Sequence, residues 1–207
     1  HEDDRTGRPV NDNGEEFEWN SAENKFVRKI HSQVAVRVVT NCQEIAIPKK
    51  YIPESEIWLN FHTEPENNLL HFLRNNYNNE LVQDVKELYA ISTSNDGGTM
   101  FWNINKYLQV QKLKITFYDE NGRRKKYFKV PYKNEDGYVS CLFGEHLLSY
   151  NCYQDKTIIL VESEKTAIVG YILMPQFAWL AYGGCNGLTK EKTSVLKGFR
   201  VLLIPDL

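Results

Sequence analysis

The fold of this chain is decided by the stretch IILVESEKTA, residues 158–167, in which an apolar run passes directly into a helical pattern. Residues 158–161 have the composition of a strand buried on both faces, and Ser163 is a suitable N-cap for the helix that follows. Glu162 stands between the two, so we expect its carboxylate at the carboxyl edge of a sheet. Ligands of open α/β sheets bind outside that edge, where a carboxylate commonly serves a metal ion or a proton.

The residues after this stretch continue to alternate between strand and helix patterns. Residues 177–181 predict a second strand, Gly183 and Gly184 a tight turn, Thr189 the cap of a second helix, and residues 201–204 a third strand. Strands that alternate with helices pair in parallel through right-handed crossovers. We therefore expect an α/β fold with a parallel sheet in βαβαβ order, incomplete at the C-terminus.

An α+β region is predicted upstream of this sheet. Residues 63–66 have the sequence of a capping box ahead of one helix, and the pattern of a second helix starts at Asn79. This helical pair is followed by an antiparallel hairpin within residues 113–130. Residues 1–50 are polar and rich in turn residues, so we expect a loosely ordered segment there, with one short hairpin over residues 34–39 and 45–47. The predicted organisation is thus residues 1–50, an α+β region over 51–148, and the start of the α/β domain over 149–207.

Composition excludes several classes of protein. The 207 residues carry a formal net charge of -2, which argues against a nucleic-acid-binding surface over the whole chain and leaves local basic patches open. The four cysteines form no C-x-x-C pair, so neither a disulfide framework nor a closed zinc site is expected. No apolar run approaches the roughly 18 residues of a membrane span, and we expect a soluble, cytoplasmic protein without a membrane partner. Because the chain begins at His1 and stops directly after a predicted strand, we also expect it to be a fragment of a longer protein.

The predicted hairpin is a candidate nucleic-acid interface. If Asn121 and Gly122 form a type I′ turn, Lys114 lies opposite Lys129, and the two like charges repel. An anionic partner would relieve that repulsion, and basic residues mixed with aromatic ones are typical of grooves for single-stranded nucleic acid. The candidate binding residues are Lys112, Lys114, Tyr118, Arg123, Arg124, Lys125, Tyr127 and Lys129. The alternative is a solvated basic edge strand that blocks aggregation.

Two acids follow predicted strands of the parallel sheet. Glu162 and Asp206 would meet at one sheet edge, where Mg²⁺ could sit between carboxylates and substrate phosphates while a remaining carboxylate acts as general acid or base. The alternative is that each acid caps a neighbouring helix N-terminus. Secondary candidates are Glu164, Lys165, Gly183 and Gly184. Capping, solvation and plain turn chemistry are the simpler explanations for these four.

Residues 159–166, ILVESEKT, resemble the first signature of the toprim domain, the catalytic module shared by bacterial primases and type IA and II topoisomerases. In that signature a strand ends in Val-Glu-Gly or Val-Glu-Ser. Residues 142–148, LFGEHLL, resemble the Leu-Tyr-Gly segment that leads into this strand in primases, which favours primase over topoisomerase. The similarity extends over residues 99–207, with a weaker fit over 63–89, and points to primase-like toprim proteins of bacterial mobile elements and phages.

The resemblance implies a toprim fold, truncated at residue 207, and a site. Glu162 matches the acid proposed to handle protons in nucleotidyl transfer, and Asp206 matches the first Asp of an Asp-x-Asp metal motif whose second Asp would follow Leu207. Ser163 stands where primases usually have Gly. The implied activity is Mg²⁺-dependent nucleotidyl transfer on single-stranded DNA, with Mg²⁺ and no zinc on this stretch, and with single-stranded DNA and a replicative helicase as candidate partners. A non-catalytic nucleic-acid-binding module on a toprim scaffold and a toprim nuclease are the alternatives, because one fold hosts several reactions.

Overall fold

The computed structural model describes residues 17–20, 25–28 and 49–205, in two compact units that divide between residues 45 and 46. In the first unit, strand β1 (Phe17–Asn20) pairs antiparallel with β2 (Lys25–Arg28). The polar composition of the N-terminal segment does not predict this pair. The short hairpin expected over residues 34–39 and 45–47 lies outside the described residues, as does Asp206.

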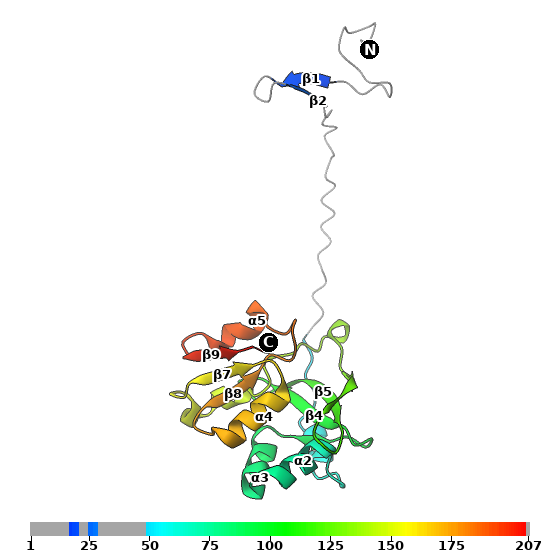
Figure 1. The fold of residues 1–207 in the computed structure, drawn as a ribbon, viewed down its shortest axis with the longest axis vertical. Helices are drawn as coiled ribbons and strands as arrows, with labels where there is room; N and C mark the ends of the chain where they lie inside the picture. Colours follow the sequence, from blue (N-terminus) through cyan, green and yellow to red (C-terminus); the bar gives the residue numbers. More distant parts are fainter. Residues whose placement is uncertain (1–16, 21–24, 29–48, 206–207) are drawn as a thin grey trace. The chain divides into compact units, whose positions relative to one another are not determined.

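The second unit contains the predicted parallel sheet. Its strands β7 (Ile158–Val161), β8 (Ala178–Ala181) and β9 (Val201–Ile204) run in the order β8-β7-β9, and β7 and β8 are buried along their whole length. Helix α4 (Glu164–Leu173) connects β7 to β8 and packs against both (Figure 1). The short helix α5 (Lys190–Thr193) and the 3₁₀ helix η4 (Ser194–Leu196) connect β8 to β9. The predicted alternation of strands and helices and their parallel pairing are confirmed.

An antiparallel sheet and three helices precede the parallel sheet in the chain. The strands β3 (Ser92–Thr93), β4 (Thr99–Ile104), β5 (Val110–Tyr118) and β6 (Arg124–Lys129) lie in sequence order. The helices are α1 (Ser55–Phe61), α2 (Asn68–Asn76) and α3 (Asn79–Leu88). Three 3₁₀ helices follow the sheet, η1 (Asn134–Asp136), η2 (Glu145–Ser149) and η3 (Asn151–Tyr153). None of the described helices is both long enough and apolar enough to cross a membrane.

The first of the two predicted helices begins later than its sequence suggests. Helix α3 starts at Asn79 as predicted, whereas α2 is capped by Asn67, whose side chain accepts a hydrogen bond from the backbone N–H of Leu70 at 3.1 Å. The predicted capping box at residues 63–66 is therefore wrong. Asn67 is buried and also exchanges hydrogen bonds with the Thr93 and Thr99 side chains, so contacts with the sheet fix the helix start.

The β5–β6 hairpin lies where it was predicted, with a different turn. The backbone N–H of Asp119 donates to the carbonyl of Arg123 at 2.9 Å, which leaves three residues in the loop, and Gly122 takes a φ of 67°. The side chain of Asp119 accepts hydrogen bonds from the backbone N–H groups of Asn121 and Arg123. These bonds stabilise the three-residue loop, so the predicted two-residue type I′ turn is wrong.

The register of the hairpin differs as a consequence. Lys129 pairs with Ile115, while Lys114 pairs on its other side with Phe101 of β4. The pairing also shifts farther along the hairpin, where Thr116 pairs with Phe128 and Tyr118 with Arg124, so the extra residues of this irregularity lie on β6. The predicted opposition of Lys114 and Lys129 is therefore wrong, and repulsion between these two lysines cannot be the reason for an anionic partner.

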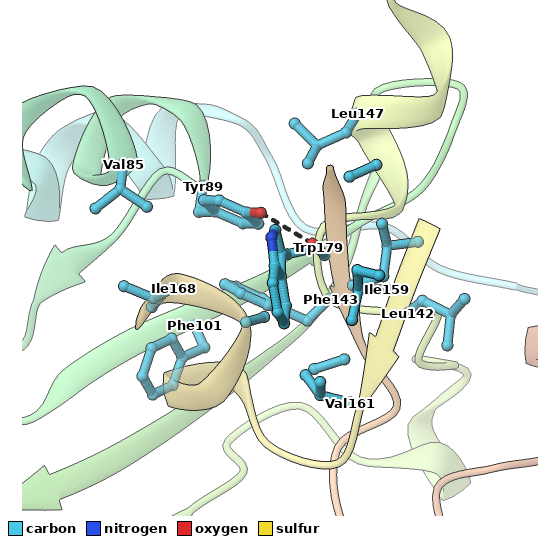
Figure 2. Close-up of a cluster of buried hydrophobic side chains, with 14 of the residues drawn as sticks. Val85, Tyr89, Phe101, Leu142, Phe143, Leu147, Ile159, Val161, Ile168 and Trp179 are labelled. Carbon is cyan, nitrogen blue, oxygen red and sulfur yellow. Dashed lines mark hydrogen bonds between the residues drawn. The ribbon is translucent and has the colours of Figure 1, made fainter. Parts of the chain in front are cut away.

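The larger core joins helix α3 to the parallel sheet around Tyr89 (Figure 2). The Tyr89 hydroxyl donates to the carbonyl of Trp179 in β8 at 2.9 Å, and the Tyr89 and Phe143 rings stack with centroids 5.1 Å apart. Phe143 also forms an antiparallel bridge with Ala181 at the end of β8. Gly144 follows with a φ of 82°, and a Cβ there would lie 2.9 Å from the Trp179 carbonyl oxygen. The Leu-Phe-Gly segment therefore packs along the edge of the sheet, where only glycine fits at its third position.

Gly170 provides a test of how tightly α4 packs on the sheet. A Cβ at this position would lie 2.3 Å from the Trp179 ring, so Gly170→Ala is expected to lower the free energy of unfolding by about 1–3 kcal/mol despite the better helix propensity of alanine. Urea denaturation measures this, with Leu173→Ala at an exposed position of the same helix as the control, where a change within about 0.5 kcal/mol is expected. A Gly170→Ala protein as stable as the wild type would contradict the observed packing.

Candidate functional site

A cleft of about 490 Å³ lies where the parallel sheet meets the antiparallel one. One wall consists of residues that follow β7 and β8, namely Glu162, Ser163, Glu164, Gly183, Gly184 and Cys185. The other wall consists of Asn103, Lys112, Leu113, Lys114, Arg124, Phe128 and Val130, and Ser140 and Lys192 complete the lining. The cleft therefore brings together Glu162 and basic residues of the hairpin that lie far apart in the sequence.

Glu162 lines the cleft with a partly exposed side chain. Its backbone carbonyl accepts hydrogen bonds from the N–H groups of Gly183 and Gly184, at 2.9 and 3.2 Å, which ties the turn after β8 to the end of β7. The two glycines have φ values of 89° and 118°, and their N–H groups are used within the turn. Within the described residues no hydrogen bond or ion pair engages the Glu162 carboxylate, which leaves it available to a ligand.

Glu164 joins the two walls of the cleft. Both of its carboxylate oxygens accept from Nζ of Lys114 at 2.9 Å, and the pair is largely buried. The helix is capped instead by Ser163, whose Oγ accepts from the backbone N–H of Thr166, as predicted. Glu164 is thus the partner of a lysine 50 residues earlier in the chain, a contact that sequence spacing could not indicate.

Basic side chains outnumber acidic ones in the cleft. Lys112, Lys114, Arg124 and Lys192 line it together with Glu162 and Glu164. Lys114 is paired with Glu164, and Nζ of Lys112 donates to Oδ1 of Asn134 and to the carbonyl of Tyr138. Burial lowers the pKa of Lys112 and of Lys192. For Lys192, the charges of Cys141 and Glu164 raise the pKa, and the charges of Lys112 and Lys114 lower it by less. Since four basic side chains line the cleft with two acidic ones, the arrangement favours a negatively charged ligand.

Lys192 is a site residue that the sequence analysis missed. Its Nζ donates to the carbonyl of Tyr182 at 3.1 Å, which holds the side chain over the end of β8. The signal for it in the sequence was its position in the helix capped by Thr189, the next helix after a strand whose carboxyl end was predicted at the ligand edge.

The predicted nucleic-acid-binding residues divide between the two faces of the hairpin. Lys112, Lys114 and Arg124 lie on the cleft face, together with the β6 residue Phe128, over whose ring the Arg124 guanidinium lies at 5.6 Å. The next residue, Lys125, is exposed on β6 and is not part of the cleft lining. Arg124 and Lys125 are thus neighbours in the sequence, of which only Arg124 lines the cleft.

The remaining hairpin candidates contact the protein itself. Tyr127 packs on the Phe117 ring with centroids 4.6 Å apart, and Lys129 forms an ion pair with Asp96. Tyr118 is buried in the core, where burial raises the pKa of its hydroxyl. Arg123 is exposed directly after the hairpin loop. None of these four lines the cleft.

Lys165 connects α4 to the hairpin loop. Its Nζ donates to the Gly122 carbonyl at 2.6 Å and lies over the Phe72 and Tyr118 rings, at 5.4 and 5.9 Å from their centroids. Burial lowers the pKa of this lysine. Its contacts are those of a side chain that joins two elements, outside the cleft.

The cleft provides some of the oxygen ligands that Mg²⁺ prefers. Glu162 offers a carboxylate that has no partner among the residues the structure describes, and a magnesium ion is commonly bound by one or two carboxylates plus substrate phosphates. Strand β9 ends beside the end of β7, since Ile204 pairs with Val161, the residue before Glu162. Asp206 lies outside the described residues. Within the described residues no group of three His, Cys, Asp or Glu side chains could hold a metal ion by itself. Among the described residues, Glu162 is therefore one candidate carboxylate for such an ion.

Comparison with known proteins gives one family match and a few similar structures. Residues 67–207 match the family model described as "Domain of unknown function (DUF6371)". No curated protein matches the sequence. Among solved structures, the RNA polymerase domain of Mycobacterium tuberculosis primase DnaG is similar at 13% identity and a TM-score of 0.39, over 65% of this chain and 47% of that chain. The same domain in complex with double-stranded DNA is similar at 9% identity and a TM-score of 0.37, over 76% of this chain and 48% of that one. This chain thus spans about half the length of these structures.

Proposed function

The chain belongs to the DUF6371 family, and from the chemistry of its cleft we propose that it binds the phosphates of single-stranded DNA and of a nucleotide and catalyses Mg²⁺-dependent nucleotidyl transfer. The observation that carries this proposal is the carboxylate of Glu162, which no hydrogen bond or ion pair engages in the described part of the chain, beside four basic side chains in one cleft. The resemblance of residues 159–166 to the toprim signature supports it. The setting that this resemblance suggests is the replication of a bacterial mobile element or phage.

The reaction assigns distinct tasks to the acid and to the basic residues. A hydroxyl oxygen of the growing strand attacks the α-phosphorus of the nucleotide, and the bond from that phosphorus to the pyrophosphate oxygen breaks as the new bond forms. Glu162 accepts the proton of the attacking hydroxyl, and pyrophosphate leaves. Lys112, Arg124 and Lys192 offset the charge on the phosphate oxygens.

Magnesium would supply further neutralisation of phosphate charge when bound. The toprim resemblance assigns its protein ligand to Asp206. The residues of this chain bind the phosphates, hold the turn after β8 in place and move the proton.

Arg124 and Lys125 offer a matched test of nucleic-acid binding. Both are exposed on β6, and only Arg124 lines the cleft. Arg124→Glu is expected to weaken binding of a labelled single-stranded DNA by about tenfold and to reduce the slope of log K against log salt by about 0.7 for each lost phosphate contact. Lys125→Glu, with the same change of sign, is expected to alter the affinity by less than about twofold. Fluorescence polarisation at several salt concentrations measures both.

The comparison of the two variants separates a defined site from a general charge effect. Equal weakening by Arg124→Glu and Lys125→Glu would indicate attraction to the whole basic hairpin and would contradict the cleft as the binding site. Full binding by Arg124→Glu would remove the proposal.

A further inference from the structure

A second cavity, of about 460 Å³, adjoins the cleft. Ser140 and Lys192 line both, so the two spaces meet at these residues. The second cavity lies beside the β4–β5 connection and the start of η2. Its lining includes the amides of Asn105, Gln109 and Gln111, the carboxylates of Glu145 and Glu191, the rings of Tyr51 and Tyr107, and the lysines Lys49, Lys106 and Lys192.

Gln111 presents an amide to this cavity. The register of β4 and β5 passes from the pair Asn103 and Lys112 to the pair Ile104 and Val110, so Gln111 is the extra residue of a β-bulge. Bulges redirect a side chain and are common beside active sites. Gln111 is only 4% exposed, and no hydrogen bond engages its side-chain amide within the described residues. Within the described residues, the buried side-chain polar atoms that lack a hydrogen bond are Thr116 Oγ1 and His146 Nδ1, so the Gln111 amide keeps contact with the open cavity and is available to a ligand there.

Glu145 places a carboxylate in the same cavity. Its two oxygens accept from the backbone N–H groups of Lys106, at 3.2 Å, and Leu142, at 3.3 Å, which fixes the orientation of the group. A carboxylate has about four acceptor sites, so two remain for a ligand. Burial raises the pKa of Glu145.

Two exposed tyrosines belong to the lining. Tyr51 precedes Ile52, whose bridge with Val110 holds the segment on the sheet, and Tyr107 lies in the β4–β5 turn with 71% of its surface exposed. The turn is fixed by Asn105, whose Oδ1 accepts from the backbone N–H of Tyr107 at 2.9 Å. Lys106 lies over the Tyr107 ring, with Nζ 5.2 Å from the centroid. The Tyr107 ring is thus exposed on a fixed turn with a positive charge beside it, and single-strand sites use aromatic rings near basic side chains as stacking surfaces.

We infer that the second cavity binds a nucleobase, with Gln111 and Glu145 hydrogen-bonding to its edge and Tyr107 stacking on its face, while the attached phosphate lies at Lys192 in the neighbouring cleft. The inference rests on the proposed function, since it assumes that the cleft binds phosphate. The base can belong to a free nucleotide or to a single strand, because both present the same edge and face.

Binding measurements on the full chain test the inference. The probes are the four deoxynucleoside triphosphates against inorganic tripolyphosphate, and a single-stranded oligonucleotide against an abasic one of the same length. The wild type is expected to bind at least one base-containing probe about tenfold more tightly than its base-free counterpart. Gln111→Leu and the surface variant Tyr107→Ala should remove most of that difference and leave the affinity for tripolyphosphate unchanged. Tyr150→Ala, at a partly exposed tyrosine outside both spaces, is the control.

The outcomes separate this inference from the proposed function. Tighter binding of a deoxynucleoside triphosphate than of tripolyphosphate identifies a site for a free nucleotide. If only the oligonucleotide binds more tightly than its abasic counterpart, the site is one for a base of a single strand. Either result supports base binding in the second cavity. Wild-type affinity for every base-containing probe in both variants would overturn the inference while tripolyphosphate binding still supported the cleft. Failure of tripolyphosphate and oligonucleotides alike to bind the wild type would overturn both.

Discussion

Replacing Glu162 by glutamine is expected to reduce primer synthesis by about 10²–10⁴-fold, the range that a positioned general acid or base contributes. Glutamine keeps the size and polarity of the side chain and removes its ability to accept the proton of the attacking hydroxyl. The Glu162 carboxylate has no partner within the described residues, so its loss leaves no protein group unpaired and the fold should be unaffected. Incorporation of a labelled nucleotide on a single-stranded template by the full-length protein, with Mg²⁺ and with a chelator, measures the effect.

Controls for this experiment also distinguish the alternative functions. Glu120→Gln, at an exposed acid of the hairpin loop, should retain wild-type synthesis, and Glu162→Gln should bind single-stranded DNA at least as well as the wild type because a negative charge has been removed from a basic cleft. Synthesis that survives Glu162→Gln would rule out the proposed role of the acid. If the wild-type protein binds single-stranded DNA but synthesises no primer, a non-catalytic binding module is favoured. If it cleaves the oligonucleotide and synthesises nothing, a nuclease is favoured.

Replacing Lys114 by methionine is expected to lower the free energy of unfolding by about 3 kcal/mol, because it leaves the carboxylate of Glu164 buried without its partner. The two side chains are 16% and 7% exposed, and both carboxylate oxygens lie 2.9 Å from the ammonium nitrogen. Methionine preserves much of the lysine stem, so the change isolates the charge. Urea denaturation at neutral pH measures it.

A second ion pair on the same sheet is the matched control. Lys129 pairs with Asp96 at a site where the side chains are 55% and 47% exposed, so Lys129→Met should cost less than about 1 kcal/mol. The double variant Lys114→Met with Glu164→Gln should recover most of the loss, since no charge is then buried. Equal costs at Lys114 and Lys129, or no recovery in the double variant, would show that Glu164 does not depend on Lys114.

Local signals in the sequence were sufficient for the elements of the parallel sheet. An apolar run that ends at Val161, a cap at Ser163 and the next cap at Thr189 each act within a few residues, and all three are observed. The register of the hairpin depends on side-chain hydrogen bonds and on a bulge as well as on the alternation of apolar residues. Hydrogen bonds from Asp119 determine the loop, and a bulge shifts the pairing, so alternation alone gives the wrong opposing residues.

The site could be predicted only in part for the same reason. The position of Glu162 follows from one strand end, whereas the partner of Glu164 lies 50 residues away on another sheet. The hairpin lysines look equivalent in the sequence because it does not show which face of β6 each one occupies. Gln111 is an ordinary polar residue until the bulge turns it inward.

Two lysine contacts connect α4 to the antiparallel sheet, and they affect both the entropic cost and the rate of ligand binding in the cleft. Lys114 reaches Glu164 from β5, and Lys165 reaches the carbonyl of Gly122 in the hairpin loop, so the two walls are cross-linked before any ligand arrives. Binding then requires little ordering of chain or side chains, which keeps its entropic cost small. The association rate should accordingly be set by electrostatic attraction during diffusion rather than by closure of a hinge.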